Sequence, residues 1–275
     1  MSGKSAIWNK YAIIAVVIAV AVVGVFATYY WILTGHNKQA SVTEGKKYLV
    51  VGTSPDFPPF EYVASNGSIV GIDIELMKHL AKMMGYDGIK IVSIDFDGLI
   101  PALTNGKIDV IAAGMTITEE RKKVVAFTVP YWSADQAILV TKNSDFKPRG
   151  LSDLEGKVVA VQSGTTGESL IDNFINKTGA KITVKRYSSF VLAVKDLLNG
   201  RVDAVIVDSP VAKLFTQKYG VEVATVIKTG EHYGLAVRKD DTQLLNALNE
   251  ALKKFLSSPE WKAIIDKYTG SAPPS

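Results

Sequence analysis

The sequence predicts an α/β protein with two related lobes, each built on an open, mostly parallel sheet flanked by helices, behind an N-terminal transmembrane helix. Three observations predict this fold: apolar strand patterns that alternate with amphipathic helix patterns, a short segment that occurs twice, and a long uncharged segment near the N-terminus. Alternation of strands and helices is typical of parallel sheets with helical crossovers.

Continuous β-branched apolar runs predict strands, and segments of helical periodicity lie between them. The predicted strands cover residues 48–53, 89–94, 108–113, 157–162, 182–187 and 203–207. The predicted helices cover residues 73–84, 97–105, 118–125, 167–178, 189–199 and 209–218, with two more in 241–268, where Pro259 begins the last one.

The repeated segment predicts that the two lobes are related. Residues 100–111 (IPALTNGKIDVI) and 194–205 (VKDLLNGRVDAV) align without a gap at an offset of 94 positions. Both predict the end of a helix, a glycine C-cap at Gly106 or Gly200, and a buried strand. A helix, a glycine and a strand form a common unit, but the shared order Asn-Gly-basic-aliphatic-Asp favours two related halves.

The segment 11–33 contains no charged residue and predicts a transmembrane anchor or an uncleaved signal. As a helix it would span roughly 34 Å, enough for the hydrocarbon core of a bilayer. The lysines within residues 1–10 favour a cytoplasmic N-terminus. The alternative is a signal peptide cleaved near Ala27. In both cases, residues 34–46 form a polar linker and the rest is extracytoplasmic.

Composition excludes several classes of function. Residues 1–46 carry most of the net charge of +4, and no run of Lys and Arg predicts contact with nucleic acid. The chain has no cysteine, which excludes disulfides and thiolate catalysis. Its three histidines are far apart in sequence. We therefore expect no metal site and no cofactor.

In open α/β sheets, ligands bind beyond the carboxyl ends of the strands, so the loops there hold the candidate site residues. The loop after residues 48–53 contains Ser54, Phe57 and Phe60 between prolines. Its rings are suited to contact a ligand or to cover the core. Phe96 follows the next predicted strand.

The loop after residues 108–113 leads into a helix in which Arg121 stands close to the N-terminus. A cation there opposes the helix dipole, so an anion is expected nearby. That anion is either Glu119 or Glu120 on the same turn, or a ligand carboxylate, which a guanidinium binds bidentately.

Two further loops contribute polar groups. In the glycine-rich segment after residues 157–162, Thr165 and Glu168 predict a capping box, and free amides there suit an anion. Asp208 ends the last strand, with Ser209 as the expected cap of the next helix. Asp208 then bonds to its own turn or to a cation. An arginine from one lobe and an aspartate from the other would together complement the two opposite charges of a zwitterion.

Residues 47–270 resemble the polar amino-acid solute-binding proteins of ABC importers, which include glutamine, arginine and lysine/arginine/ornithine binders of the type II periplasmic-binding-protein fold. The segments that carry the resemblance are GTSPDFPPFEY (52–62), GIDIELM (71–77), DFDGLIPALTNGKIDVIAAGMTITEERKK (95–123), GKVVAVQSGTT (156–166) and DAVIVDSP (203–210).

The resemblance implies a two-segment hinge and two lobes. The hinge would comprise residues 131–135 and 229–233, lobe 1 residues 47–130 and 234–270, and lobe 2 residues 136–228. Arg121 would bind the ligand carboxylate and Asp208 its ammonium group, while Phe57 and Phe96 would enclose the side chain. The ligand-binding residues expected in full are Ser54, Phe57, Phe96, Gly114, Met115, Thr116, Arg121, Gln162, Thr165, Thr166 and Asp208.

One position departs from the binders of basic side chains, which often carry an acid where this chain has Ser54. Glu61 and Asp73 remain as candidate acids. The two rings suit a flat guanidinium or carboxamide, so arginine or glutamine is the expected ligand.

The resemblance further implies a monomer that delivers its ligand to a permease served by a separate ATPase. It implies binding without catalysis. The alternatives are a ligand-sensing ectodomain and an enzyme similar to cyclohexadienyl dehydratases, which share the fold.

Overall fold

A computed structural model describes residues 48–270 of the chain. The predicted cytoplasmic segment, anchor and linker (1–10, 11–33 and 34–46) lie outside the described residues. Within the described part, no helix combines the length and the apolar character needed to cross a membrane.

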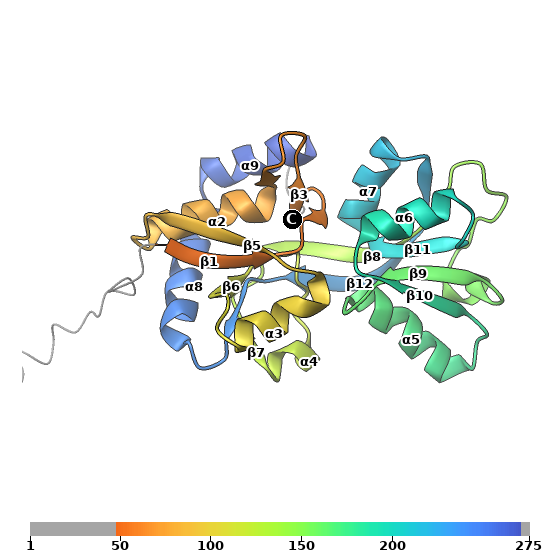
Figure 1. The fold of residues 1–275 in the computed structure, drawn as a ribbon, viewed down its shortest axis with the longest axis horizontal. Helices are drawn as coiled ribbons and strands as arrows, with labels where there is room; N and C mark the ends of the chain where they lie inside the picture. Colours follow the sequence, from red (N-terminus) through yellow and green to blue (C-terminus); the bar gives the residue numbers. More distant parts are fainter. Residues whose placement is uncertain (1–47, 271–275) are drawn as a thin grey trace, which may run out of the picture. The chain divides into compact units, whose positions relative to one another are not determined.

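Residues 48–270 form two lobes, each centred on a five-stranded sheet (Figure 1). We call the part built on the first sheet lobe 1 and the part built on the second sheet lobe 2. In spatial order, the first sheet comprises β5 (Gly88–Ser93), β1 (Tyr48–Thr53), β6 (Val110–Ile111), β13 (Ala236–Arg238) and β7 (Val125–Phe127). The second comprises β10 (Thr183–Tyr187), β9 (Val158–Gln162), β11 (Ala204–Asp208), β8 (Trp132–Thr141) and β12 (Val221–Tyr233).

Helices cover these sheets, with α6 and α7 on one side of the second sheet and α5 on the other (Figure 1). The helices are α2 (Ile72–Met83), α3 (Leu99–Thr104), α4 (Glu119–Lys122), α5 (Thr166–Thr178), α6 (Phe190–Leu198), α7 (Ser209–Lys218), α8 (Thr242–Leu256) and α9 (Pro259–Thr269). Short 3₁₀ turns are η1 (Phe96–Gly98) and η2 (Leu151–Leu154). The predicted elements form with two corrections. The strand expected at 108–113 is reduced to Val110–Ile111, and the helix expected at 118–125 is reduced to Glu119–Lys122, because Val125 already belongs to β7.

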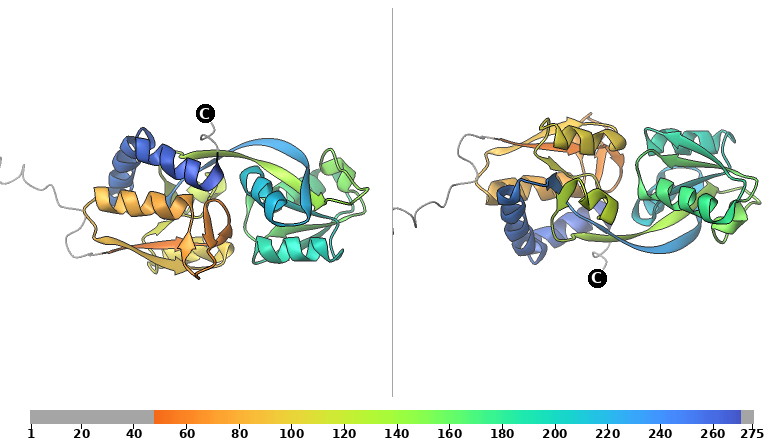
Figure 2. Two further views of the ribbon diagram at one scale, coloured as in Figure 1. Left: turned by 90° about the horizontal axis from the view of Figure 1, so that it is seen from above. Right: turned by 90° about the horizontal axis from the view of Figure 1, so that it is seen from below.

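Both sheets also contain antiparallel strands. In the first sheet β13 runs antiparallel to β6 and β7, and in the second β8 runs antiparallel to β11 and β12. The long strands β8 and β12 pair with each other and cross side by side between the lobes (Figures 1 and 2).

The sequence repeat occupies equivalent places in the two lobes. Asp109 accepts a hydrogen bond from the Val50 amide of β1 at 3.0 Å, and Asp203 accepts one from the Val158 amide of β9 at 2.8 Å. In each copy of the repeat, an aspartate directly before the strand therefore fixes that strand to its parallel neighbour.

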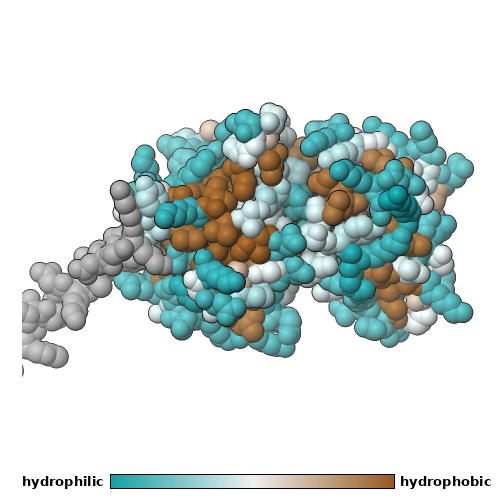
Figure 3. Space-filling model, in the orientation of Figure 1, coloured by the Kyte–Doolittle hydropathy of each residue, from teal (hydrophilic) through white to brown (hydrophobic). Residues whose placement is uncertain are grey.

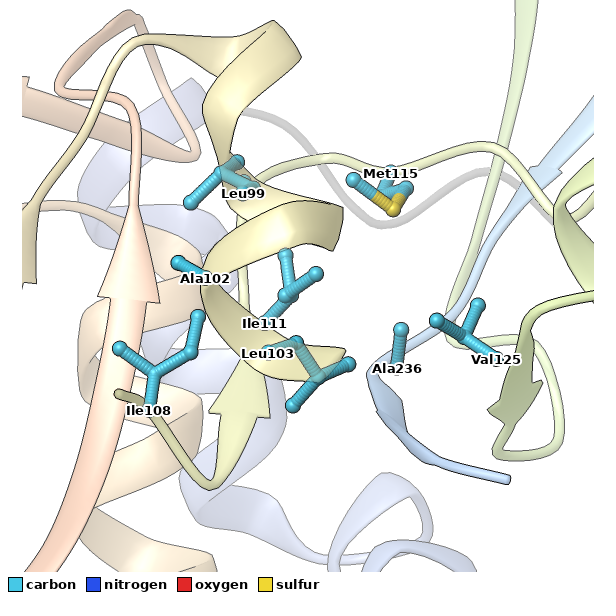
Figure 4. Close-up of a cluster of buried hydrophobic side chains, with 9 residues drawn as sticks. Leu99, Ala102, Leu103, Ile108, Ile111, Met115, Val125 and Ala236 are labelled. Atoms are coloured by element: carbon cyan, nitrogen blue, oxygen red, sulfur yellow. The ribbon is translucent and has the colours of Figure 1, made fainter. Parts of the chain in front are cut away.

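Each lobe has its own apolar core. In lobe 1, a cluster joins α3 to β6, β7 and β13, and Figure 4 shows Met115 within it. In lobe 2, Ile138, Val161 and Ile206 belong to the corresponding cluster. Figure 3 shows apolar atoms at the surface of lobe 1 over β1 and β5, in agreement with the half-buried residues of β5.

A small antiparallel sheet of β2 (Asp56–Phe57), β3 (Glu61–Val63) and β4 (Ile69–Val70) connects β1 to α2. Gly71 joins β4 to α2 with φ of 139°, and a Cβ atom there would lie 2.1 Å from the Phe60 carbonyl oxygen. Only glycine satisfies both conditions, because the opposing atom belongs to the backbone.

Replacing Gly71 with alanine is expected to lower the free energy of unfolding by about 1–3 kcal/mol, because it combines a strained φ with a backbone overlap. Urea denaturation of G71A measures the loss. G67A is the matched control, since Gly67 also has a positive φ but no atom within 4 Å of the added Cβ. Equal losses in the two variants would show that the overlap is relieved at no cost.

Candidate functional site

A cavity lies where the strand-end loops of the two lobes meet. The lining residues are Ser54, Asp56, Phe57, Glu61, Phe96, Gly114, Thr116, Arg121, Gln162, Thr165, Thr166 and Asp208. Ten of the eleven residues expected from the sequence are therefore brought together.

Met115 is the expected residue that does not line this cavity. Its side chain is buried in the apolar cluster of lobe 1, against α3 and β7 (Figure 4). Residues Gly114 and Thr116 on either side of it line the cavity, whereas the Met115 side chain packs into the core.

Arg121 donates from Nη1 to the Thr116 carbonyl at 2.7 Å and from Nη2 to the Gly164 carbonyl of lobe 2 at 2.9 Å. Its guanidinium also lies 5.3 Å from the centroid of the Phe96 ring. Burial lowers the Arg121 pKa to about 10, although Asp208 and Glu231 oppose this shift. Arg121 therefore stays cationic at neutral pH.

The glutamates on the same turn do not supply the anion expected near Arg121. Glu119 pairs with Lys122, and Glu120 pairs with Lys123. The Thr118 side chain caps α4 by accepting from the Arg121 amide at 3.1 Å. The guanidinium is thus held by carbonyl groups, which orient it without neutralising it.

The Asp208 side chain is buried at the end of β11. Its carboxylate accepts from Gln136 Nε2 at 2.9 Å and from the Tyr233 hydroxyl at 2.5 Å. Burial raises the Asp208 pKa to about 7, with a further contribution from the charge of Glu231. Local turn bonding is therefore not its role, and Ser209 is the first residue of α7 rather than its cap.

The glycine-rich turn forms the N-terminus of α5. The Thr165 side chain accepts from the Glu168 amide at 3.2 Å, which is one half of the predicted capping box. The Glu168 carboxylate accepts from the amide of Gly164 at 2.6 Å, one residue before the N-cap. Gln162 from the preceding strand donates to Asp56 at 3.2 Å and to the Ser188 carbonyl at 2.9 Å.

The aromatic wall has a dual role. Phe57 packs on Phe60 and on Phe190 of lobe 2, each with ring centroids 5.7 Å apart, so it covers the core and lines the cavity at once. Gly114 makes room for it, because a Cβ at Gly114 would lie 2.5 Å from the Phe57 ring.

Asp56 lines the cavity although the sequence argument did not select it. Its carboxylate accepts from the Phe190 amide at the start of α6 at 2.7 Å and from the Ser54 hydroxyl at 3.3 Å. Burial raises the Asp56 pKa, and these hydrogen bonds counteract the shift. Asp56 thus stands two residues from Ser54, in the region where an acid is expected for basic ligands.

Glu61 is the second acid of the wall. It is fully buried, and no N–H or O–H group of the described residues donates to either of its carboxyl oxygens. Burial and the neighbouring Asp73 raise its pKa well above the usual value. Asp73 accepts from the Gly114 amide at 2.8 Å and from the Tyr131 hydroxyl at 2.7 Å, and burial raises its pKa to about 6.

Comparisons with known proteins agree with this architecture. Residues 49–271 match the family model of the bacterial extracellular solute-binding proteins, family 3. A probable histidine-binding protein of Neisseria gonorrhoeae is 35% identical over 242 residues, which cover 85% of this chain and 88% of that protein. The ABC transporter arginine-binding protein 1 of Escherichia coli K12 is 35% identical over 223 residues, which cover 79% of this chain and 88% of that protein.

Solved structures share the fold at higher identity. The arginine-bound form of truncated ArgBP from T. maritima is 50% identical with a TM-score of 0.72, covering 76% of this chain and 96% of that one. An ancestral arginine-binding protein bound to glutamine is 42% identical with a TM-score of 0.77, covering 82% and 99%. An ancestral amino acid-binding protein, described as a precursor of cyclohexadienyl dehydratase, is 39% identical with a TM-score of 0.75, covering 81% and 96%.

Proposed function

Because the chain belongs to the family 3 bacterial extracellular solute-binding proteins, which serve amino-acid import by ABC transporters, we propose that it captures arginine outside the cytoplasm. Arginine-binding relatives and the arginine-bound structural neighbour support this choice. The single observation that carries it is the excess of acid in the cavity wall.

The wall contains three carboxyl groups, those of Asp56, Glu61 and Asp208, and one cationic side chain, that of Arg121. A zwitterionic amino acid uses Arg121 for its carboxylate and Asp208 for its ammonium group. Burial and Asp73 raise the pKa of Glu61 well above the usual value and favour its neutral form, so Asp56 is the acid left to pair with a cationic ligand side chain. Burying an unpaired carboxylate is costly, so the site favours a ligand with net positive charge.

The shape of the wall favours a guanidinium over an ammonium group. Phe57 and Phe96 offer flat faces, on which a planar cation stacks. Asp56 already accepts from the Phe190 amide, from Gln162 and from the Ser54 hydroxyl, which use most of the about four acceptor positions of a carboxylate. A guanidinium between the rings would therefore interact with Asp56 mainly through its charge.

Glutamine is the second candidate, and the glutamine-bound ancestral structure favours it. Its carboxamide is also flat and donates to a carboxylate. It carries no charge, however, and would leave Asp56 unneutralised in a mostly buried position.

Replacing Asp56 with asparagine is expected to weaken arginine binding at least tenfold while changing citrulline binding much less, because citrulline has the shape of arginine without its charge. Hydrogen bonds between charged groups are worth about 1.5–3 kcal/mol, which corresponds to roughly 10- to 150-fold. Calorimetric titration of both ligands against the wild-type and D56N domains measures the ratio of affinities.

The ratio is the informative quantity, because Asp56 also contacts lobe 2 and its loss affects every ligand. A D56N domain that keeps the wild-type preference for arginine over citrulline would refute the assignment of Asp56. A wild-type domain that binds glutamine more tightly than arginine would refute the assignment of the ligand.

We propose that capture proceeds by lobe closure about residues 131–135 and 229–233. In this scheme lobe 1 comprises residues 47–130 and 234–270, and lobe 2 residues 136–228. The pairing of Glu231 with Ala134 and Tyr233 with Trp132 supports a hinge of two strands. A ligand that touches Arg121 in lobe 1 and Asp208 in lobe 2 stabilises the closed form, because only that form offers both groups.

We also propose that residues 11–33 hold a monomeric binding domain at the outer face of the membrane, where it meets a permease served by a separate ATPase. The absence of charge in this segment supports anchoring.

We propose no catalysis. The relatives named above are binding proteins, and the structural neighbour described as a dehydratase precursor is itself an amino acid-binding protein.

A further inference from the structure

Glu231 lies at the hinge, outside the cavity wall, and receives four hydrogen bonds from side chains. Its Oε2 accepts from the hydroxyls of Thr116 at 2.7 Å and Thr166 at 2.6 Å. Its Oε1 accepts from Gln136 Nε2 and from the Thr229 hydroxyl, both at 3.0 Å. Four donors satisfy a carboxylate completely.

These donors come from both lobes. Thr116 follows β6 of lobe 1, whereas Thr166 is the first residue of α5 in lobe 2. A single oxygen of Glu231 therefore joins the two lobes through two threonines. Separation of the lobes would break at least one of these charge-assisted bonds, which are about twice as strong as neutral ones.

Both threonines line the cavity, so Glu231 fixes cavity residues without touching the space itself. The Thr116 carbonyl accepts from Arg121, and Gln136 donates both to Glu231 and to Asp208. The same carboxylate thus orients the supports of both groups that are proposed to bind the ends of the ligand.

The local backbone directs Glu231 toward the lobes. The pairing of β8 with β12 shifts register between Ile227 and Glu231, and Gly230 within this irregularity has φ of 64°. The Asp135 carboxylate accepts from the Thr229 amide at 2.9 Å and the Gly230 amide at 3.0 Å, which holds the turn in place.

We propose that Glu231 is a positioning residue that couples ligand capture to lobe closure, because its carboxylate fastens Thr116 of lobe 1 to Thr166 of lobe 2 behind the cavity. Its coupling to arginine capture rests on the function proposed above. The fastening of the lobes involves only side chains of this chain and is testable by itself.

The test compares E231A, E231Q and a control, E222A, in the complete binding domain. Glu222 lies on the same strand and pairs with Lys147, so its loss removes an acid of β12 without touching Thr116 or Thr166. Small-angle X-ray scattering without ligand measures closure, and calorimetry measures arginine affinity. Thermal unfolding shows that each variant is folded.

We expect E231A to increase the radius of gyration of the ligand-free domain and to weaken arginine binding about tenfold or more. E231Q should restore part of both properties, because its amide keeps one acceptor oxygen, and E222A should match the wild type. Unchanged scattering and affinity in folded E231A would overturn the proposal.

A double variant tests whether Glu231 acts through Thr166. T166V removes the hydroxyl and keeps the shape of the side chain. If the bond carries the effect, T166V should change affinity in the wild type but hardly in E231A. If the losses of arginine affinity in T166V and E231A simply add in the double variant, Glu231 does not act through Thr166. If the wild type binds no arginine, the proposed function fails, while the scattering of ligand-free E231A still decides the fastening role.

Discussion

Replacing Arg121 with alanine is expected to weaken ligand binding by about 2–5 kcal/mol, or roughly 30- to 4,000-fold. The loss is large because the variant leaves the ligand carboxylate in the cavity without its cationic partner. Arg121 is the one cationic side chain among the residues that line the cavity, so no neighbour replaces it. Calorimetric titration with arginine measures the effect.

R121K separates charge from geometry. Lysine keeps the positive charge but lacks the planar fork that donates to Thr116, to Gly164 and to a carboxylate together. Its affinity should lie between those of R121A and the wild type. K122A is the control, because Lys122 is on the same helix and pairs with Glu119. Near-normal arginine affinity in R121A would contradict the assignment.

Arginine affinity is expected to fall up to about tenfold for each pH unit below 7, because Asp208 must be ionised to bind an ammonium group. Burial and the charge of Glu231 raise its pKa to about 7, while the Tyr233 hydroxyl, Gln136 and Arg121 oppose the shift. Below pH 7 the ligand has to displace a proton. Above pH 7 the affinity should level off.

The sign is opposite for stability without ligand. The folded-state pKa of Asp208 lies above the ordinary value of 3.8, so the folded state holds this proton more tightly than the unfolded state. The contribution of Asp208 to stability is therefore present below about pH 3.8 and is lost as pH rises to about 7.

D208N tests the statement on affinity. The variant should bind arginine at least 30-fold more weakly at pH 8, and its affinity should no longer depend on pH through this group. Titrations between pH 5.5 and 8.5, in two buffers of different ionisation enthalpy, count the protons released. A flat affinity profile for the wild type would refute the role of Asp208.

The elements predicted from sequence are those with a local signal. Helix α5 begins at Thr166 and ends before Gly179, because Thr165 caps one end and a left-handed glycine closes the other. Strands β9 and β11 carry unbroken apolar runs that are buried. In such segments the local preference and the packing agree.

Strands β8 and β12 were not predicted, because their stability is not local. Much of β12 is half-exposed and polar, and its hydrogen bonds go to β8, about 90 residues earlier in the chain. The antiparallel additions to the sheets depend on such long-range pairing, which periodicity along the chain does not reveal.

The site residues also divide into those with a local sequence signal and those that depend on long-range contacts. Arg121 stood out because a cation near the N-terminus of a helix opposes the helix dipole. Asp208 stood out because it ends a strand beside Ser209, the residue expected to cap the next helix. Asp56 and Glu231 gave no such signal, since an acid beside prolines or in a hinge is typical of an exposed turn. Only the approach of lobe 2 buries Asp56 against Phe190, and only the two threonines give Glu231 its place.

The paired aspartates Asp109 and Asp203 mark two related halves that carry opposite charges at different places. The strand of the first copy leads into the loop that carries Arg121, and the strand of the second copy ends in Asp208. At the offset of 94 positions Arg121 corresponds to Phe215 and Asp208 to Gly114, so each half has a charge where the other half has none. The proposed recognition of a zwitterion thus depends on what each copy has added to the shared scaffold, and not on the scaffold itself.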